Sequence, residues 1–505
     1  KRTQEVRTLL NKWKQKITKF VCFALTCQLF ILTAWAKPDW PSDTGIMAEA
    51  GIVMDMDSGA ILYGQNIHLT YPPASITKIL TALIVLENCS LDDTVTFSTT
   101  AVNQVEADSG NKISVVAGDQ LSVEDCLYSL LLVSCNQAAN ALAEHTAGSI
   151  SAFVDMMNEK LVELGCQESH FENPSGLNGD NQYVSAYDMA LIAQAAYDNE
   201  TMVEISSATT HKIAPTTQNP DGFTIRGEHR LCVTEDQSSP YYYPEAVAGK
   251  TGYLIKAGNT LVTYAVKDNR RLVSVILKGQ PRQYFVDGKA LLEFGFRSFQ
   301  NYTVADYESR YVTGNETINL DKGSFQASDL MIDPDSVITL PNGASFEDAD
   351  ISLGALPEVS PDNAVALLTY TYNDRVIGTA YLLVKDGVTI DNGDGSTGAS
   401  ATTGDGSTNA SGSADTANSS LATSSNATDS QRTHRSFSIA GVLVTILIVL
   451  LVLAVIGITG WIIYSRKKEA KALAERRKRR RQRLQRSGDQ EEFERLLEEY
   501  KNKKK

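Results

Sequence analysis

The longest uncharged run in the chain extends from Phe437 to Tyr464, near the C-terminal end. About 20 apolar residues are enough for a helix to cross a bilayer. Arg435 precedes the run and a basic cluster begins at Arg466, and basic residues concentrate on the cytoplasmic side of membrane helices. We therefore expect a single transmembrane helix over 437–464, a cytoplasmic basic tail over 465–505, and everything before residue 437 on the extracellular face of the cell membrane.

The first 36 residues have the pattern of a targeting segment. Basic residues are scattered over residues 1–19, and an apolar stretch from Phe20 ends in Ala34-Trp35-Ala36. This order is typical of a secretory signal peptide, which we place at residues 1–36. An uncleaved membrane anchor is the alternative, because the apolar stretch is close to the shortest that spans a bilayer.

Composition separates a folding body from its flanks. Residues 387–436 are rich in Gly, Ser, Thr, Asn and Asp, with few large apolar side chains, so we expect a disordered tether. The net charge is −14 although both ends are basic, and an acidic body argues against a nucleic-acid partner. The basic tail is expected to meet anionic lipid headgroups.

Cysteine and histidine spacing gives no metal pattern. Five cysteines follow residue 36, no pair has C-x-x-C spacing, and one disulfide stays open as an alternative. The histidines are scattered, and no H-E-x-x-H motif is present. We expect neither a metal ion nor a cofactor. The six histidines are His68, His145, His170, His211, His229 and His434.

A serine and a lysine lie at the start of a predicted buried helix. Ser75-Ile76-Thr77-Lys78 follows two prolines and precedes an apolar run from Ile79 to Leu86. Proline before good helix formers marks a helix start, and apolar residues on nearly all faces indicate burial. Three residues apart, the two side chains share a face, and a desolvated amine can act as a base toward a hydroxyl. A second S-x-x-K, at Ser109, has a polar setting and is interpreted as chance.

Two further triplets follow in the chain. Ser134-Cys135-Asn136 lies between two apolar segments, where both polar side chains could face one cleft. Lys250-Thr251-Gly252 occurs once and is expected to open the strand Leu261 to Val266, which pairs with Leu272 to Leu277. On an edge strand beside a cleft, lysine and threonine can bind a carboxylate, and glycine allows close approach of the substrate backbone. Taken singly, either triplet could be an ordinary turn.

In this order the four-residue motif and the two triplets are the motif set of penicillin-binding proteins and serine β-lactamases. The chain resembles the low-molecular-mass D-alanyl-D-alanine carboxypeptidases in particular, over roughly residues 48–299. Beyond the triplets, the resemblance is carried by Ala50 to Asp55, Phe171 to Leu177 and Leu291 to Phe296. It implies a serine-type carboxypeptidase that removes the terminal D-Ala from peptidoglycan stem pentapeptides and takes part in cell-wall maturation. β-Lactam antibiotics would acylate the same serine.

The resemblance also implies roles for individual residues. Ser75 would be the nucleophile and Lys78 its base, while Ser134 would pass a proton to the leaving group. Substrate would be bound by Asn136, Lys250, Thr251, Gly252 and Tyr253, with the backbone N–H groups of Ser75 and Tyr253 forming the oxyanion hole. Arg282 is the nearest candidate for the arginine that the family places near the substrate carboxylate.

Two other functions share these motifs. A class A β-lactamase needs a glutamate that activates the deacylating water, and Glu172 is the candidate for that role. Glu172 is, however, part of a carboxypeptidase-like motif. The second alternative, a penicillin sensor that signals through its tail, finds no catalytic pattern in residues 465–505.

The expected fold class is α/β. We expect a penicillin-binding catalytic domain over 37–299, with an antiparallel sheet flanked by helices and the cleft between the sheet and a helical subdomain. A small β domain should follow over 300–386, because short alternating runs replace the helical pattern. Within it, Val365 to Tyr372 and Val376 to Val384 flank Asn373-Asp374, which predicts a hairpin.

Overall fold

The computed structural model describes residues 37–105, 110–177, 179–233, 238–357 and 359–388. The predicted signal peptide, transmembrane helix and tail lie outside these residues, as does the tether apart from its first two positions. Within the described ranges, no helix is both long enough and apolar enough to cross a bilayer.

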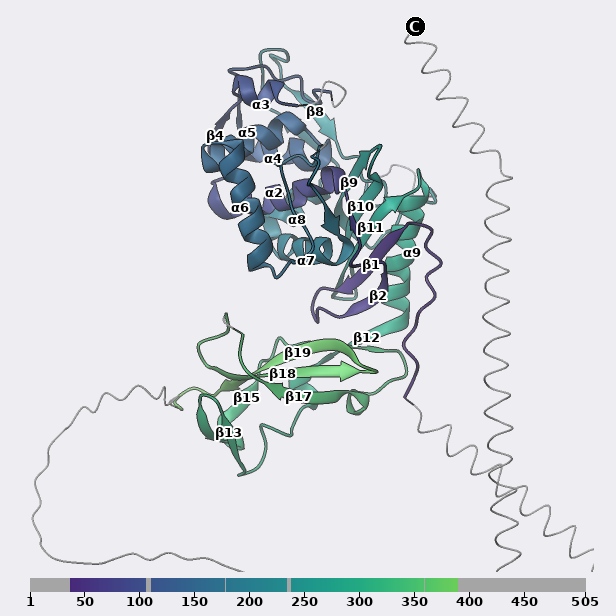
Figure 1. Ribbon diagram of the computed structural model, residues 1–505, viewed down its shortest axis with the longest axis vertical. Coiled ribbons are helices and arrows are strands. Elements are labelled where there is room, and N and C mark those ends of the chain that lie inside the picture. The colour runs from purple at the N-terminus through teal and green to yellow at the C-terminus, as the bar shows by residue number, and fades with distance from the viewer. Residues whose placement is uncertain (1–36, 106–109, 178, 234–237, 358, 389–505) are drawn as a thin grey trace, which may run out of the picture. The chain divides into compact units, whose positions relative to one another are not determined.

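A five-stranded antiparallel sheet forms the centre of the first part of the chain (Figure 1). Its strands alternate in the direction of their side chains, as pleated strands must. In the strand over residues 270–279, Val273 and Val275 pack on one face of the sheet, whereas Leu272 and Ile276 pack on the opposite face. In spatial order the strands are β2 (Ile61–Gln65), β1 (Ala50–Asp55), β11 (Arg270–Gly279), β10 (Gly258–Lys267) and β9 (Ala246–Leu254).

Helices cover both faces of this sheet. The long segment between β2 and β9 supplies the helical subdomain on one face, and α9 (Gln283–Ser298) packs on the other (Figure 1). The predicted α/β class, an antiparallel sheet flanked by helices, is therefore confirmed. The helical segment contains η1 (Ala74–Thr77), α2 (Lys78–Asn88), α3 (Thr99–Asn103), α4 (Val123–Leu132), α5 (Asn136–Ala147), α6 (Ile150–Glu163), α7 (Ala186–Tyr197) and α8 (Glu200–Ser207).

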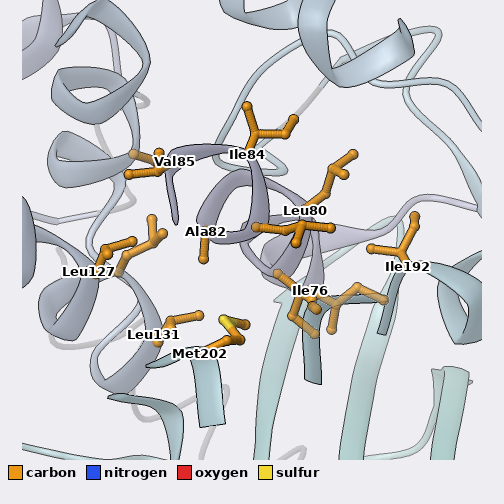
Figure 2. Packing of buried hydrophobic residues seen from close by; sticks show 14 of the residues in the cluster. Ile76, Leu80, Ala82, Ile84, Val85, Leu127, Leu131, Ile192 and Met202 are labelled. Carbon is orange, nitrogen blue, oxygen red and sulfur yellow. The ribbon is translucent and has the colours of Figure 1, made fainter. Parts of the chain in front are cut away.

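Helix α2 runs through the middle of the helical subdomain. All of its residues from Lys78 to Val85 are buried. Figure 2 shows side chains of α2 such as Leu80 and Ala82 surrounded by Leu127 of α4, Ile192 of α7 and other apolar residues. The predicted helix, apolar on nearly all faces, is thus confirmed. It begins with one 3-10 turn, η1, which contains Ser75.

The predicted strand pairing is close to the observed one, but the predicted position of the triplet Lys250-Thr251-Gly252 is wrong. Residues Leu261 to Val266 of β10 pair with Leu272 to Ile276 and Arg271 of β11, close to the predicted pairing. Lys250-Thr251-Gly252 does not open that strand, however: it lies inside β9, a separate strand at the sheet edge, which pairs with β10. In this pairing Thr251 lies opposite Leu261 and Gly252 opposite Thr260, so the triplet and the predicted strand are neighbours across the sheet.

Short two-stranded ladders connect the helices. They hold loops of the helical subdomain together without joining the central sheet. The pairs are β3 (Thr70–Tyr71) with β6 (Val184–Ser185), β4 (Thr94–Thr96) with β5 (Gln120–Ser122), and β7 (Thr210–Ile213) with β8 (Phe223–Arg226).

The segment after α9 is rich in β-strands and has its own apolar core, which includes Tyr370 and Tyr372. The expected domain boundary at residue 299 falls at the first residue of β12. Residues Asn373 and Asp374 both have positive φ, 48° and 62°, and form the two-residue turn of the predicted hairpin. The elements are β12 (Phe299–Thr303), α10 (Val304–Tyr307), β13 (Thr317–Leu320), β14 (Gly323–Gln326), η3 (Ala327–Asp329), β15 (Leu330–Ile332), β16 (Val337–Pro341), η4 (Phe346–Asp348), β17 (Asp350–Gly354), β18 (Ala364–Tyr372) and β19 (Arg375–Val384).

Candidate active site

The side chains of Ser75 and Lys78 meet at the start of α2. Ser75 lies in the 3-10 turn η1, Lys78 is the first residue of α2, and Lys78 Nζ lies 3.2 Å from Ser75 Oγ. Ser75 is half-buried, whereas Lys78 is completely buried. The short spacing between them in the sequence places the two groups on one side of the first turn, as predicted.

Lys78 Nζ has two further partners. It lies 2.8 Å from Asn136 Oδ1 at the start of α5 and 2.5 Å from the carbonyl oxygen of Ser175. An ammonium group has three protons, and all three have an acceptor here. A neutral amine has only two, so one of the three neighbours must then face its lone pair. Ser75 is the only neighbour of the three whose oxygen carries a proton, and the neutral amine therefore accepts a hydrogen bond from the serine hydroxyl.

The neutral form of Lys78 is favoured electrostatically. Burial lowers the pKa of Lys78 well below the ordinary lysine value, and the positive charge of Lys250 lowers this pKa further. Desolvation penalises the charged form of a buried amine, and a like charge adds to the penalty. The arrangement can therefore supply a base next to a serine hydroxyl, the pairing that activates a nucleophile.

The carbonyl of Ser175 is positioned by the loop Phe171 to Leu177. The side chain of Asn173 accepts hydrogen bonds from Ser175 N at 3.2 Å, Ser175 Oγ at 3.0 Å and Gly176 N at 2.8 Å. Gly176 has φ +79°, and a Cβ at this position would overlap the carbonyl oxygen of Ala74. The loop thus folds back on its own asparagine and packs tightly against η1.

The role of this loop was not predicted. The segment was noted only as part of the family resemblance, although Asn-Pro-Ser-Gly is a recognisable cluster of turn formers. Its hydrogen bonds extend to the next turn of α2, since Thr81 Oγ1 donates to Pro174 O at 2.7 Å. The loop therefore holds the first two turns of the helix that carries the serine and the lysine.

Strand β9 approaches the serine from the other side. A Cβ on Gly252 would lie 2.8 Å from Ser75 N and 2.4 Å from Thr260 Oγ1, so only glycine allows this distance. Thr260 in turn donates to Pro73 O at 3.0 Å, which ties β10 to the turn before Ser75. The sequence predicted that this glycine would permit a close approach of the substrate backbone. In the structure, the backbone it approaches is the chain's own.

The other residues of the third triplet differ in exposure. Lys250 is buried, and burial lowers its pKa to about 8, with Glu228 opposing and Lys112 adding to the shift. Its Nζ donates to Thr251 O at 2.8 Å. Thr251 is half-buried, and Tyr253 exposes 61% of its surface on the same strand. Lys250 is thus a cation close enough to Lys78 to lower that residue's pKa.

Ser134 lies in the turn between α4 and α5, directly before Cys135 and Asn136. Its φ is 61°, a left-handed conformation that is unusual for a residue with a side chain. Within the described part of the chain, its hydroxyl makes no hydrogen bond to Ser75 or Lys78. The structure therefore joins Asn136 of the second triplet directly to Lys78, while Ser134 lies beside Asn136 in the turn.

A cavity of about 570 Å³ opens next to β9. Thr251 lines it, together with the guanidinium-bearing residues Arg230 and Arg282. Arg282, the candidate for carboxylate binding, has φ 63° directly before α9. The remaining lining residues are Gly227, Glu228, Val233, Asn259, Pro281, Tyr284 and Phe285.

The glutamate considered for a β-lactamase has other partners. Glu172 Oε2 accepts a hydrogen bond from Asn181 N at 3.2 Å, inside the loop that follows the Asn173 turn. Among the described residues, Glu172 makes no hydrogen bond or ion pair with Ser75 or Lys78. The five described cysteines are free thiols, so the disulfide left open in the sequence does not form among them.

Comparison with known proteins agrees with these motifs. Residues 37–280 match a protein family described as D-alanyl-D-alanine carboxypeptidase. A D-alanyl-D-alanine carboxypeptidase of Haemophilus influenzae is 31% identical over 358 residues, which cover 68% of this chain and 86% of the relative. One from Mycobacterium tuberculosis is 34% identical over 265 residues, covering 51% and 84%. This chain belongs to the D-alanyl-D-alanine carboxypeptidase family.

The solved structures add the fold. Penicillin-binding protein 5 from Haemophilus influenzae superposes with a TM-score of 0.52 at 25% sequence identity, covering 69% of this chain and 98% of that one. This structural match covers more of the chain than residues 37–280, which are the part that the family match covers. As a member of this family, the chain is a hydrolase of the serine peptidase type.

Proposed function

We propose that this enzyme removes the terminal D-Ala from peptidoglycan stem pentapeptides through an acyl-enzyme on Ser75. The observation that carries the proposal is the buried amine of Lys78, 3.2 Å from Ser75 Oγ, with a lowered pKa. Family membership supports the reaction, and the names of the relatives supply its substrate class.

In the first step the Ser75 oxygen attacks the carbonyl carbon of the penultimate D-Ala. Its proton passes to Lys78 Nζ, which can accept it because Ser75 is the neighbour that faces the lone pair of the neutral amine. The backbone N–H groups of Ser75 and Tyr253 stabilise the negative oxygen of the tetrahedral intermediate. Gly252 supports this assignment, because it brings the end of β9 next to Ser75 N.

The amide bond then breaks and D-Ala leaves. Its nitrogen takes a proton that Ser134 relays, while Asn136 holds the substrate amide. The carboxylate of the leaving residue is bound by Lys250 and Thr251, and Arg282 adds positive charge on the cavity side. Water then attacks the ester on Ser75 and gives a proton to Lys78. The bond between the carbonyl carbon and Ser75 Oγ breaks, and Lys78 returns the proton to Ser75 Oγ, which frees the enzyme.

β-Lactam antibiotics are proposed to acylate Ser75 in the same way. Their ring amide offers the serine a carbonyl in place of the D-Ala-D-Ala bond, and the ring carboxylate would meet the same cations. The likeness to a penicillin-binding protein of known structure supports this second reactivity.

We further propose that the enzyme works outside the cell, tethered to the membrane by the helix at 437–464. The uncharged run and the basic residues after it support this arrangement. The enzyme and its peptidoglycan substrate would then share one compartment. After alkaline washing of membranes, the full chain should stay in the pellet, and a chain ending at residue 436 should not; retention of both would contradict the anchor.

The proposed reaction is tested by incubating the purified full chain with a pentapeptide that ends in D-Ala-D-Ala. Wild type should release D-Ala, and Ser75→Ala should release it at least about a thousandfold more slowly. Ser109→Ala, in the second S-x-x-K, is the matched control and should behave as wild type.

Equal release by wild type and Ser75→Ala would overturn the nucleophile. Penicillin hydrolysis without D-Ala release would instead indicate a β-lactamase. Stable penicillin labelling with no release of D-Ala would indicate a sensor.

A further inference from the structure

A cysteine, an aspartate and a histidine come together at the far end of the helical subdomain from Ser75. Cys89 caps the C-terminus of α2, Asp93 lies in the loop that follows, and His145 is in the last turn of α5. The thiol sulfur, a carboxylate oxygen and an imidazole nitrogen all lie within 4.8 Å of one another. In the part of the chain that the structure describes, this is the only such group with metal-ligand atoms so close together.

The three donors suit a zinc-class ion. Zinc binds thiolate, imidazole and carboxylate, and bond lengths of 2.0–2.3 Å put the ligand atoms of a tetrahedral site roughly 3.3–3.8 Å apart. His145 Nε2 already lies 3.7 Å from Asp93 Oδ2. To bind one ion, the sulfur of Cys89 must approach the other two ligand atoms by about 1 Å, and rotation of the side chains can supply this movement. Hard ions such as calcium and magnesium prefer oxygen ligands only.

The surroundings of the three side chains favour a cation. Both α2 and α5 end here, and the C-terminus of a helix carries partial negative charge. No basic residue lies in the last turn of α2, so that charge is uncompensated by a side chain of its own helix. The Asp93 carboxylate is oriented by a hydrogen bond from Ser90 N at 3.0 Å. Supporting bonds of this kind are typical around metal ligands.

We propose that Cys89, Asp93 and His145 bind one divalent ion of the zinc class, with water from solvent in the fourth position. The side chains of His145 and Asp93 are 26% and 45% exposed, which leaves the site open to ions. Binding replaces the proton of the Cys89 thiol, which is released to solvent, while His145 coordinates as the neutral imidazole. No bond in the protein is broken.

This site joins the two helices that form the catalytic cluster. Helix α2 begins at Lys78 and α5 begins at Asn136, whose side chains lie 2.8 Å apart. The metal ligands are at the other ends of the same helices, about 16 Å away for a helix of this length. A bound ion therefore fixes the pair at both ends and stabilises the helical subdomain. The sequence predicted no metal because its ligands come from segments with no motif spacing.

The test uses the purified, metal-free full chain titrated with cobalt(II), a coloured substitute for zinc. One equivalent should produce the strong thiolate-to-cobalt absorption band, and zinc should remove it by competition. Cys89→Ser should abolish the band, and His145→Gln should weaken binding at least about tenfold. Zinc should also raise the unfolding temperature of wild type and not of Cys89→Ser.

A second histidine–carboxylate pair provides the matched control. His68 Nδ1 lies 3.0 Å from Glu168 Oε1 at an exposed position, and among the described residues no cysteine completes this pair into a group of three metal-ligand atoms. His68→Gln should leave cobalt and zinc binding unchanged. The absence of the thiolate band in wild type, its persistence in Cys89→Ser, or an equal loss in His68→Gln would each overturn the proposal. Far-ultraviolet circular dichroism shows whether every variant is folded.

Discussion

At the scale of single residues, the buried polar groups under β9 decide how the site behaves with pH. Lys78 and Lys250 are both buried, and both have lowered pKa values, to about 8 for Lys250. Next to them His229 is buried under Gly249, where a Cβ would lie 2.6 Å from its Nε2. Three buried nitrogens with lowered pKa values thus lie close to one strand.

His229 gives a prediction about stability. Burial lowers the pKa of His229 from 6.5 to about 4. The unfolded chain therefore takes up this proton first as the pH falls, so the free energy of unfolding decreases between pH 6.5 and about 4. A shift of this size corresponds to about 3 kcal/mol. Above pH 6.5 the histidine is neutral in both states and has no effect on the slope.

The measurement is urea unfolding of wild type and His229→Gln between pH 7 and pH 4. Glutamine can still donate to Val262 O, the partner of His229 Nε2 at 3.1 Å, but does not titrate. Between pH 7 and pH 4, the free energy of unfolding of the variant should fall by about 3 kcal/mol less than that of wild type. All other titrating groups are common to both chains, so parallel curves would contradict the lowered pKa.

At the scale of elements, the loop Phe171 to Leu177 shows how a turn outside the motifs positions Lys78. Its Asn173 side chain orders the backbone, and the Ser175 carbonyl then accepts from Lys78 Nζ. A turn made of Asn, Pro, Ser and Gly is recognisable in the sequence. The contact of this turn with Lys78 is not recognisable in the sequence, because Ser175 and Lys78 are brought together only by the packing of the loop on η1.

Gly176→Ala should be far more damaging than the same change at Gly165. Both glycines have positive φ, +79° and +74°, which costs a residue with a Cβ about 1–2 kcal/mol. At Gly165 nothing lies within 4 Å of the added atom, whereas at Gly176 it meets the Ala74 carbonyl. We expect a loss of about 1 kcal/mol for Gly165→Ala and about 3 kcal/mol or more for Gly176→Ala.

Chemical unfolding measures both losses, and the rate of acylation by a fluorescent penicillin measures the effect on the site. Gly165→Ala should react at the wild-type rate. Gly176→Ala should react more slowly, because the shifted loop takes the Ser175 carbonyl away from Lys78. Equal acylation rates in the two variants would show that the loop does not position the base.

At the scale of the whole molecule, Asp55 links the central sheet to the β-rich segment that follows α9. Its buried carboxylate accepts from Arg270 Nη2 at 3.0 Å and from Asn301 Nδ2 of β12 at 3.3 Å. Close by, Ser58 Oγ and Thr339 Oγ1 of β16 lie 2.7 Å apart. Polar contacts between the end of β1 and the strands β12 and β16 thus connect two separate apolar cores.

Removing this carboxylate should destabilise the protein strongly. In Asp55→Ala the mostly buried Arg270 loses its partner, and an uncompensated buried charge costs about 3–5 kcal/mol. Asp57→Ala is the control: it breaks the bond to Arg271, a half-exposed residue that keeps Asp198 as a partner. That change should cost about 1 kcal/mol or less. Urea unfolding compares them, and equal losses would contradict the structural role of Asp55.

The sequence by itself determined the chemistry and the local elements of this protein. Serine, lysine and the two later triplets identify the reaction in any arrangement that brings them together, and the apolar run after Lys78 specifies a buried helix. Asn373-Asp374 specifies a turn because these residues tolerate positive φ. Such features depend on neighbours in the chain, which a sequence displays.

Only the tertiary structure decided which distant groups meet. The placement of Lys250 in an edge strand of its own, the Ser175 carbonyl at Lys78, and the group of Cys89, Asp93 and His145 all depend on how helices and loops pack. Packing is set by the whole set of side chains in the core, and no spacing along the chain records it.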